Sequence, residues 1–480
     1  MVTSTDPVEL GLAALTFHHV IDGQLVENQQ FDHRRDPRTN AVLWKVPVAG
    51  QHELEAAVTA AQNAFRSWSK TSFSERQNVM RQLTSKLRDS KALIAAIVSK
   101  ETGKSAFMSE LEVDHSIAFL EFNSSQQLLD ETIQEDTIMK IVKTHSPLGI
   151  VAAICPWNFP LVLAVAKVAA ALVTGNCVIV KPSPFTPYSI LKFAEIARDI
   201  IPSGIFQALN GNNTLGEHMT THPGIDKVSF TGSTATGKKI MESASRTLKR
   251  ITLELGGNDA TIVCPDVDVK KAASEVANGC FFNAGQMCVA TKRVYVHEDV
   301  YNEFRREFLE AVKAFSLKSL PDLHPIFGPI QNHMQYAIVQ EFIQDCKTHG
   351  YQIVTGGDAV TPGLFIEPTV VDNPPDNSRV VKDEQFGPII PLLSWKEEDE
   401  VVRRANHTET GLGACVWAKD RDYAEHLGRR LEVGSVWINS YEKPNPVGYF
   451  SGHKQSGIGG EWGRQGLLSY CNTQILHIYK

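Results

Sequence analysis

The chain lacks a long apolar run. The longest, 161–173, has 13 residues and includes Lys167. A membrane-spanning helix needs about 20 mostly apolar residues, so we interpret this run as a buried helix whose lysine extends its amine to solvent. The apolar segment 10–15 is too short for the core of a signal peptide, and no basic residue precedes it. We therefore expect a cytoplasmic protein with no membrane partner.

Patterns typical of disulfides, zinc sites and nucleic-acid binding are also missing. The eight cysteines are widely spaced, with no C-x-x-C pair and no cluster of cysteine with histidine. This spacing favours a reducing compartment and predicts no bound metal. The net charge is −7 and the arginine pairs 403–404 and 429–430 are isolated. Because nucleic-acid binding usually requires a basic stripe, we expect no nucleic-acid partner.

From residue 150 onward, short apolar runs alternate with helical segments. The runs 150–154 and 177–180 are typical of buried strands, and 161–173 lies between them as a helix. Such alternation predicts a parallel sheet with helices on both faces. A second alternating region begins near residue 260, and a chain of 480 residues exceeds what one core usually supports. We therefore expect two α/β domains.

Further strands are expected near both ends of the chain. Residues 17–48 are rich in strand formers, with Asp22-Gly23 as a tight hairpin turn. A helical pattern covers 105–130. The segment 474–478 is a strand candidate with no later segment to pair with, so either 137–143 or a partner subunit completes its hydrogen bonds.

Cys288 is the main candidate for chemistry. It follows a helix expected over 267–282, in a turn where Ala284 and Gly285 allow a ligand or another backbone to approach closely. A cysteine acts as a nucleophile in its thiolate form, which needs an electropositive and partly accessible pocket. The alternative is a buried structural cysteine, as most free cysteines are.

Glu254 and Asn158 are candidates for helping such a cysteine. Glu254 ends a strand-like run before two glycines, where it would activate water against an intermediate on the sulfur. Its alternative is a solvated carboxylate. Asn158 directly precedes the apolar helix, where its amide would be one arm of an oxyanion hole. Its alternative is a simple helix N-cap.

Two segments suggest contacts with phosphate and ribose. Residues 232–237 (GSTATG) follow a strand and open a helix, as a phosphate-binding turn does, but they lack the G-x-G-x-x-G spacing. Lys181 ends another strand, from which it would reach a ribose or phosphate. An exposed lysine at a strand end is the plain alternative.

Seven short motifs follow one another along the chain. They are 156–160 (PWNFP), 180–183 (VKPS), 230–234 (FTGST), 253–257 (LELGG), 285–288 (GQMC), 384–388 (EQFGP) and 452–457 (GHKQSG). Taken together, they closely resemble the aldehyde dehydrogenase family, whose motif order is kept from about residue 18 to the end. Ordered motifs are far more specific than any single motif.

The resemblance implies a fold in three parts. A Rossmann-type cofactor domain would cover 1–123 and 147–256, and an α/β catalytic domain would cover 257–467. The segments 124–146 and 468–480 would form a small β oligomerisation arm. The resemblance also implies a homodimer or homotetramer.

The same resemblance implies a hydrolytic oxidation. Cys288 would attack the aldehyde carbon while Asn158 and the Cys288 N–H hold the oxyanion. Hydride transfer would leave a thioester, and water activated by Glu254 would release the carboxylic acid. Relatives that pass the acyl group to coenzyme A typically lack this general base. Glu461 falls where relatives have a carboxylate in the path of the water.

The implied cofactor is NAD. The carried-over cofactor residues are Trp157, Lys181, Ser183, Gly232, Ser233, Glu384 and Phe386. Glu384 would bind the nicotinamide ribose, Phe386 would lie against the ring, and Lys181 would bind the adenosine ribose. Pro184 stands where many NAD-preferring relatives carry a glutamate, so NADP is an alternative cofactor. No arginine nearby in the sequence is an obvious ligand for its extra phosphate.

An apolar tunnel is implied for the substrate. Its expected lining is Phe159, Leu163, Ala166, Met287, Val289 and Phe450. Ala166 is small where several relatives have an aromatic residue, so apolar aliphatic or aromatic aldehydes are expected. Two alternatives stay open: a semialdehyde dehydrogenase that acylates coenzyme A, and a catalytically silent structural or ligand-binding homologue.

Overall fold

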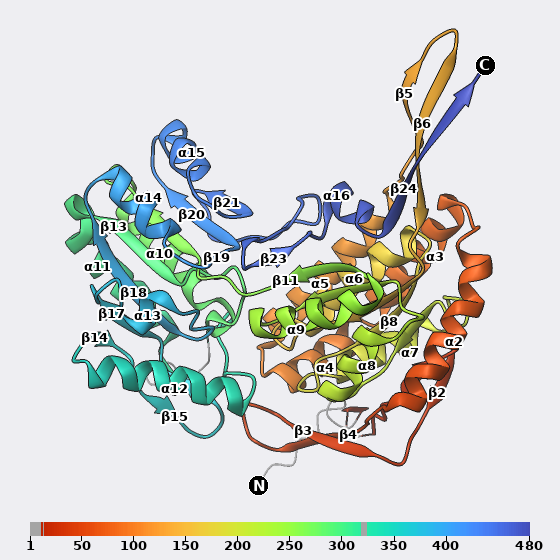
Figure 1. The fold of residues 1–480 in the computed structure, drawn as a ribbon. Coiled ribbons are helices and arrows are strands. Elements are labelled where there is room, and N and C mark those ends of the chain that lie inside the picture. Colours follow the sequence, from red (N-terminus) through yellow and green to blue (C-terminus); the bar gives the residue numbers. More distant parts are fainter. Residues whose placement is uncertain (1–10, 13, 318–323) are drawn as a thin grey trace.

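Two α/β lobes and a projecting arm make up the molecule (Figure 1). The computed structural model describes residues 11–12, 14–317 and 324–480. One lobe contains an eight-stranded sheet, the other a seven-stranded sheet, and the arm a three-stranded sheet. This arrangement confirms the expected fold class. Within the described ranges, no helix has the length and apolar character needed to cross a membrane.

The first sheet has a parallel centre with antiparallel strands at its edges. Its order is β2 (Gln24–Val26), β1 (His19–Ile21), β9 (Phe206–Ala208), β8 (Cys177–Lys181), β7 (Ile150–Ile154), β10 (Lys227–Thr231), β11 (Arg250–Glu254) and β23 (Gly457–Ile458). The helices of this lobe are α2 (Gln51–Trp68), α3 (Phe73–Asp89), α4 (Lys91–Thr102), α5 (Ala106–Ser124), α6 (Pro160–Val173), α7 (Tyr188–Ala197), α8 (Asn213–Thr221) and α9 (Thr234–Ala244).

The buried centre of this sheet explains the alternating sequence. Every residue of β7 and β8 is buried, which suits strands covered by helices on both faces. Helix α6 is also buried at every position except Leu163. β7, β8, β10 and β11 are parallel neighbours, so their carboxyl ends meet at one edge, where ligands bind in open α/β sheets.

The second lobe is also built on a mostly parallel sheet. Its order is β14 (Gln352–Thr355), β17 (Thr369–Asp372), β18 (Ile389–Trp395), β13 (Arg293–His297), β12 (Ala260–Val263), β20 (Gly413–Trp417) and β21 (Ser435–Ile438). Its helices are α10 (Val269–Phe281), α11 (Glu298–Val312), α12 (His333–Thr348), α13 (Arg379–Lys382), α14 (Glu398–Asn406) and α15 (Arg421–Arg429). The remaining elements are β3 (Phe31–Arg35), β4 (Val42–Pro47), β15 (Ala359–Val360), β16 (Phe365–Ile366), β19 (Thr410–Gly411), β22 (His453–Lys454) and α16 (Gly463–Leu468).

The arm combines two distant segments of the chain. β24 (Cys471–Tyr479) pairs antiparallel with β6 (Met139–Pro147), which pairs in turn with β5 (Glu131–Glu135). Of the two candidates for pairing with the C-terminal strand, the segment 137–143 is therefore the one that pairs with it, through β6. The helix expected over 105–130 is shorter than the sequence indicates, because α5 ends at Ser124.

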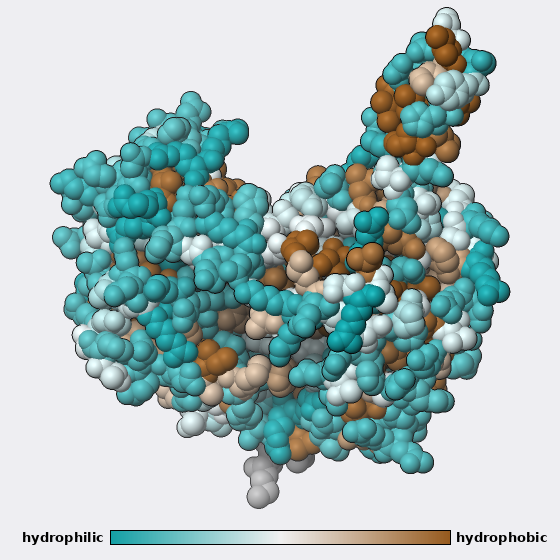
Figure 2. All heavy atoms as spheres, viewed as in Figure 1, coloured by the Kyte–Doolittle hydropathy of each residue, from teal (hydrophilic) through white to brown (hydrophobic). Residues whose placement is uncertain are grey.

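Apolar side chains are exposed on the arm and near its base. The space-filling view shows them as brown atoms on the projection (Figure 2). The exposed residues are Leu129, Ile133, Ile138, Ile475, Leu476, Ile478 and Tyr479.

The two lobes are joined by short crossings of the backbone. Residues 255–259 connect β11 to β12, and β23 returns from the later part of the chain to pair with β11. The Ser456 hydroxyl, just before β23, donates to the Gly256 carbonyl at 2.6 Å, which holds this returning segment against the 255–259 connection. The domain boundaries expected at 123, 146, 256 and 467 stay predictions.

Candidate active site

Cys288 lies in a tight turn after α10. The preceding residues Asn283, Ala284 and Gly285 have φ of 51°, 54° and 73°, in the left-handed region. A Cβ at Gly285 would lie 2.4 Å from the Gly387 carbonyl oxygen, so this position accepts only glycine. The turn leaves Cys288 half-buried, whereas six of the eight cysteines are fully buried. Its partial accessibility disfavours a purely structural role.

The surroundings of Cys288 favour the neutral thiol. Burial raises the pKa of the Cys288 thiol to about 12. The positive charge of Lys292 opposes this shift, while the negative charges of Asp259, Glu384 and Glu254 add to it. Glu254 therefore lies close enough to Cys288 for its charge to affect the ionisation of the thiol.

Asn158 is tied to the same turn and is not a helix cap. Its side-chain amide donates to the Gln286 carbonyl at 3.0 Å. The N-terminus of α6 is satisfied instead by Glu112, whose Oε1 accepts from the Leu161 amide at 2.9 Å. The N-cap reading is therefore wrong. The amide of Asn158 also has a second N–H, for which the described residues supply no acceptor, so it can donate to a ligand beside Cys288.

Glu254 ends β11 with an unusual carboxylate. The residue is 5% exposed, and both carboxylate oxygens are without a partner among the described residues. Burial raises the pKa of Glu254 well above its ordinary value, the charge of Glu461 raises it further, and Lys167 lowers it. Because burying an unpaired carboxylate is costly, the reading as a solvated strand-end residue is wrong.

Lys167 and Glu461 form a buried ion pair near Glu254. The Lys167 ammonium lies 2.5 Å from Glu461 Oε1, and the Ser229 hydroxyl donates to the same oxygen at 2.5 Å. The Lys167 side chain is 0% exposed. The expectation that this lysine extends to solvent is therefore wrong, because its charge is neutralised inside the lobe.

The expected phosphate and adenosine contacts lie at the carboxyl edge of the first sheet. Lys181 ends β8 and is buried, which lowers the pKa of its ammonium to about 8. Ser183 follows it, and its hydroxyl accepts from the Phe185 amide at 3.2 Å. Gly232 follows β10, and Ser233 is the N-cap of α9, accepting from the Thr236 amide at 3.3 Å. Donors at a helix N-terminus suit a phosphate.

An arginine missed by sequence reasoning lies next to Pro184. Arg34 comes from β3, 150 positions earlier, and its Nε donates to the Pro184 carbonyl. The guanidinium also pairs with Asp32 at 2.6 Å. The sequence offers no local signal for this approach, because the contact depends on how β3 crosses the first lobe.

Residues expected to hold the nicotinamide end come from both lobes. Glu384 Oε1 accepts from the Gly257 amide at 3.2 Å, and a Cβ at Gly256 would lie 2.2 Å from Glu384 Oε2. Trp157, from the first lobe, meets Phe386, from the second, edge to face with ring centroids 5.4 Å apart. These contacts place a carboxylate and an aromatic pair across the junction of the lobes, which fits the ribose and ring of a nicotinamide dinucleotide.

The six expected substrate residues fall in two adjoining apolar clusters. Met287, Val289 and Phe450 belong to one, Ala166 to the other, and Leu163 packs against the second. Phe159 contacts both clusters, as does Trp462. Trp462 lies 4.5 Å from Phe450 and 5.0 Å from Phe119 by ring centroids.

Sequence reasoning missed several members of these clusters. They are Phe119, Val162, Phe282, Ala290, Leu412, Trp437 and Trp462. The one available signal was position, since Trp462 directly follows the expected Glu461 and Phe282 is the last residue of the helix expected before Cys288. Phe119 lies on α5, far from every motif.

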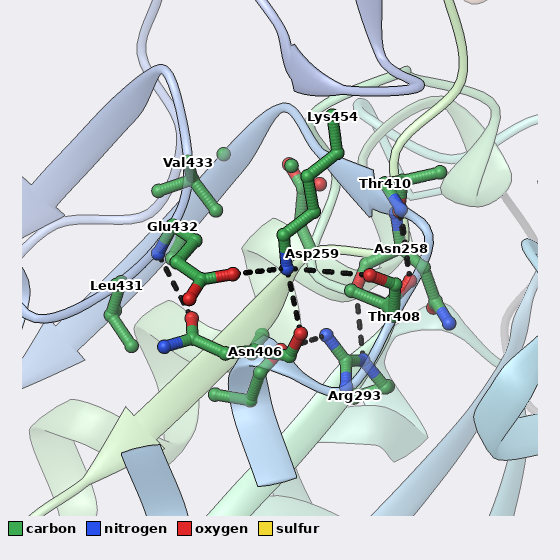
Figure 3. Close-up of a pocket in the computed structure, with 15 residues that line it drawn as sticks. Asn258, Asp259, Arg293, Asn406, Thr408, Thr410, Leu431, Glu432, Val433 and Lys454 are labelled. Carbon is green, nitrogen blue, oxygen red and sulfur yellow. Dashed lines mark hydrogen bonds and ion pairs between the residues drawn. The ribbon is translucent and has the colours of Figure 1, made fainter. Parts of the chain in front are cut away.

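A separate small cavity lies in the second lobe (Figure 3). Lys454 donates there to the carbonyls of Asn406 at 2.7 Å and Thr408 at 3.3 Å, and pairs with Glu432 at 2.7 Å. Asp259 also lines this cavity, but none of the expected site residues does. These contacts hold the loops around β12 and β20 together.

Comparison with known proteins gives the class of this molecule. A family model described as "Aldehyde dehydrogenase family" matches residues 26–476. The chain therefore belongs to the aldehyde dehydrogenase family and is an enzyme.

Relatives match over nearly the full chain. Aldehyde dehydrogenase LUC3 of Fusarium sp is 41% identical over 468 residues, covering 97% of this chain and 99% of the relative. Retinaldehyde dehydrogenase 3 of Homo sapiens is 37% identical over 455 residues, covering 92% and 88%. The structure of betaine aldehyde dehydrogenase from Staphylococcus aureus in complex with NAD+ superposes with a TM-score of 0.93, at 30% identity and covering 98% and 96%.

Proposed function

We propose that this enzyme oxidises an aldehyde to the carboxylic acid with NAD(P), and that water rather than coenzyme A releases the product. The observation that carries the proposal is Glu254 beside Cys288. Its carboxyl group is buried and has no partner among the described residues, yet it is close enough for its ionised form to raise the pKa of the Cys288 thiol. A buried group left unpaired beside a nucleophile is best explained by a task in catalysis.

The first half of the reaction forms an acyl group on sulfur. The Cys288 thiolate adds to the aldehyde carbon, and the carbonyl oxygen takes up the negative charge. The Asn158 amide and the Cys288 N–H donate to this oxyanion. Bound NAD(P) supplies the hydride acceptor. As the C–H bond breaks and the C=O bond forms again, the thiohemiacetal becomes a thioester on Cys288.

The second half hydrolyses the thioester. Glu254 takes a proton from water while the water oxygen attacks the acyl carbon. The C–S bond then breaks, which releases the carboxylic acid and returns the sulfur as thiolate. Glu461 lies close enough to raise the pKa of Glu254, while Lys167 lowers it, so we assign this pair to the control of the base.

NAD is the proposed cofactor, with NADP also accepted. Lys181, Ser183, Gly232 and Ser233 would hold the adenosine and phosphate end, and Trp157, Glu384 and Phe386 the nicotinamide end. Pro184 presents no carboxylate to repel a 2′-phosphate. Arg34 offers a cation near the same position, although Asp32 partly neutralises it.

The proposed substrates are apolar aliphatic or aromatic aldehydes. Phe159, Leu163, Ala166, Met287, Val289 and Phe450 all belong to or pack against the two apolar clusters. Cys288 itself packs against one of them. A wall of aromatic rings suits a flat or branched apolar substituent next to the reacting carbonyl.

We also propose that the enzyme is a homodimer or homotetramer and that it acts in the cytoplasm. The arm exposes apolar side chains on a sheet whose edge strands have no further neighbour in the described chain. Such surfaces usually mark protein contacts. The dispersed free cysteines are in keeping with a reducing compartment.

One steady-state comparison tests this function. The purified enzyme is given hexanal, benzaldehyde and betaine aldehyde, each with NAD or NADP, and reduced cofactor and acid are measured. We expect acid from the two apolar aldehydes and no acceleration by coenzyme A. Strong acceleration by coenzyme A would instead support an acylating enzyme, and no reduced cofactor with any aldehyde would support a silent homologue.

A further inference from the structure

The ammonium of Lys292 is enclosed beneath the turn that carries Cys288. The Lys292 side chain is 2% exposed. Its Nζ donates to the carbonyls of Met287 at 3.1 Å, Cys288 at 2.7 Å and Ala290 at 3.1 Å. A lysine ammonium has three N–H donors, so the turn accounts for all of them.

The first of these contacts sets the direction of the Cys288 amide. The Met287 carbonyl and the Cys288 N–H belong to one planar trans peptide and therefore point in opposite directions. Lys292 and the Ala290 amide, at 3.0 Å, both hold the Met287 oxygen. The Cys288 N–H consequently points away from Lys292, and no acceptor for it is found among the described residues.

The other oxyanion donor is fixed on the same turn. The Asn158 amide donates to the carbonyl of Gln286, which immediately precedes Met287. Two neighbouring carbonyls of this turn therefore accept hydrogen bonds from side chains: Met287 from Lys292 and Gln286 from Asn158. Their orientation decides whether the donors of Asn158 and Cys288 converge on one oxygen atom.

Lys292 also links this turn to the nicotinamide end of the site. Its Nζ lies 3.6 Å from Glu384 Oε1. Around it are the buried acids Asp259 and Glu442 and the partly exposed Glu384, and loss of hydration raises the pKa of all three carboxyls. Lys292 is the cation that offsets the effect of Asp259, Glu384 and Glu254 on the Cys288 thiol.

We propose that Lys292 is a positioning residue for the oxidation: it orients the Cys288 N–H toward the oxyanion and supplies the charge that favours the thiolate. This inference rests on the proposed function and extends it to a residue outside the matched motif 285–288. The competing explanation is that Lys292 only neutralises the buried acids around it.

Lys292→Met tests the proposal, because it keeps the apolar part of the side chain and removes the three N–H donors as well as the positive charge. Lys292→Gln keeps donors without charge. Lys249→Met is the matched control, since Lys249 is also buried and donates to the carbonyls of His222 and Ile225. Should Lys292→Met alone fail to fold, Asp259→Asn is added to it, which removes a buried acid that Lys292 offsets.

Two rates are measured for each variant. The first is the pre-steady-state burst of reduced cofactor with benzaldehyde. The second is alkylation of Cys288 by iodoacetamide without aldehyde or cofactor, from about pH 6 to pH 10, followed by mass spectrometry of its peptide. Alkylation needs thiolate but no oxidation, so it stays informative even if the proposed function fails.

We expect Lys292→Met to slow the burst by roughly 10²-fold, the usual effect of losing one oxyanion donor. Its alkylation should be slower at every pH of this range, which amounts to a profile moved to higher pH, because the thiol loses its neighbouring cation. Lys292→Gln should recover part of the burst but not the alkylation profile, and Lys249→Met should change neither. An unshifted alkylation profile in Lys292→Met, or a burst as fast as in Lys249→Met, overturns the proposal.

Discussion

Lys167 and Glu461 are 294 positions apart in the sequence and form an ion pair of 2.5 Å in the interior of the first lobe. Glu461 also exchanges two backbone hydrogen bonds of 2.8 Å with Phe450, and Trp462 follows it. One short segment therefore joins the charged surroundings of Glu254 to the apolar cluster proposed for the substrate. A change at Glu461 is expected to affect stability and catalysis together.

Glu461→Gln should weaken the fold because it leaves the Lys167 charge unpaired inside the protein. Removing one partner of a buried pair costs roughly 3–5 kcal/mol, measured as the free energy of unfolding in urea. Glu432→Gln is the control: it breaks the ion pair with Lys454 at an acid that is 60% exposed. An exposed pair contributes at most about 1 kcal/mol. Equal losses in the two variants would contradict a buried pair.

Glu254→Gln should stabilise the enzyme at alkaline pH. The pKa of Glu254 is raised well above 4.5, mainly by burial. Above that value the unfolded chain ionises this group while the folded enzyme keeps it neutral, so folding becomes less favourable by up to about 1.4 kcal/mol per pH unit until the folded pKa is reached. Glutamine does not ionise, so the variant does not lose this folding free energy as the pH rises.

Thermal unfolding without cofactor checks this sign. Near pH 8 the Tm of Glu254→Gln should be higher than that of the parent enzyme, and near pH 5 the two Tm values should be equal. Glu75 is a control of opposite sign, because hydrogen bonds from Ser72 lower the pKa of its carboxyl. Glu75→Gln should therefore lose stability above the ordinary carboxyl pKa. A Glu254→Gln variant that is less stable than the parent near pH 8 would refute the unpaired carboxylate.

Ala166→Trp should narrow the substrate range. Ala166 lies in the apolar cluster with Phe119 and Val162, and an indole there would occupy space proposed for the substrate. We expect kcat/KM for benzaldehyde to fall at least about tenfold while that for acetaldehyde changes little, since a misfit in an apolar pocket costs about 1–3 kcal/mol. Parallel losses for both aldehydes would mean that the pocket lies elsewhere.

Pro184→Glu should separate the two cofactors. A carboxylate at this position would repel a 2′-phosphate but accept hydrogen bonds from ribose hydroxyls. We expect the ratio of kcat/KM with NADP to that with NAD to fall at least about tenfold, because like charges in contact cost more than about 1.4 kcal/mol. Arg34→Ala should lower the same ratio less. An unchanged ratio in Pro184→Glu would exclude this position from the adenosine site.

Local pattern was enough to predict most of the first lobe. The apolar runs that became β7 and β8, and the helix α6 between them, are buried by the parallel sheet that their alternation indicates. β18 was not predicted, although it lies between β17 and β13. It contains Pro391, and proline in a central strand argues against such an assignment.

Long-range pairing explains the remaining misses at the site. Lys167 looks like a solvent-directed lysine until Glu461 is brought beside it from the far end of the chain. Arg34 reaches Pro184 only through the path of β3, and Phe119 reaches Trp462 only through the packing of α5. Sequence periodicity carries no information about such contacts. The order of the family motifs instead makes Cys288 and Glu254 the predicted catalytic residues.

The most direct measurement of the central claim is the time course of cofactor reduction by Glu254→Gln. In this account the thiohemiacetal forms and transfers its hydride without Glu254, but the thioester then waits for an activated water. We therefore predict a burst close to one equivalent per active site, steady turnover reduced by roughly 10²-fold or more, and an acyl adduct on Cys288 visible by mass spectrometry. Loss of the burst in equal proportion to turnover, with no adduct, would contradict it.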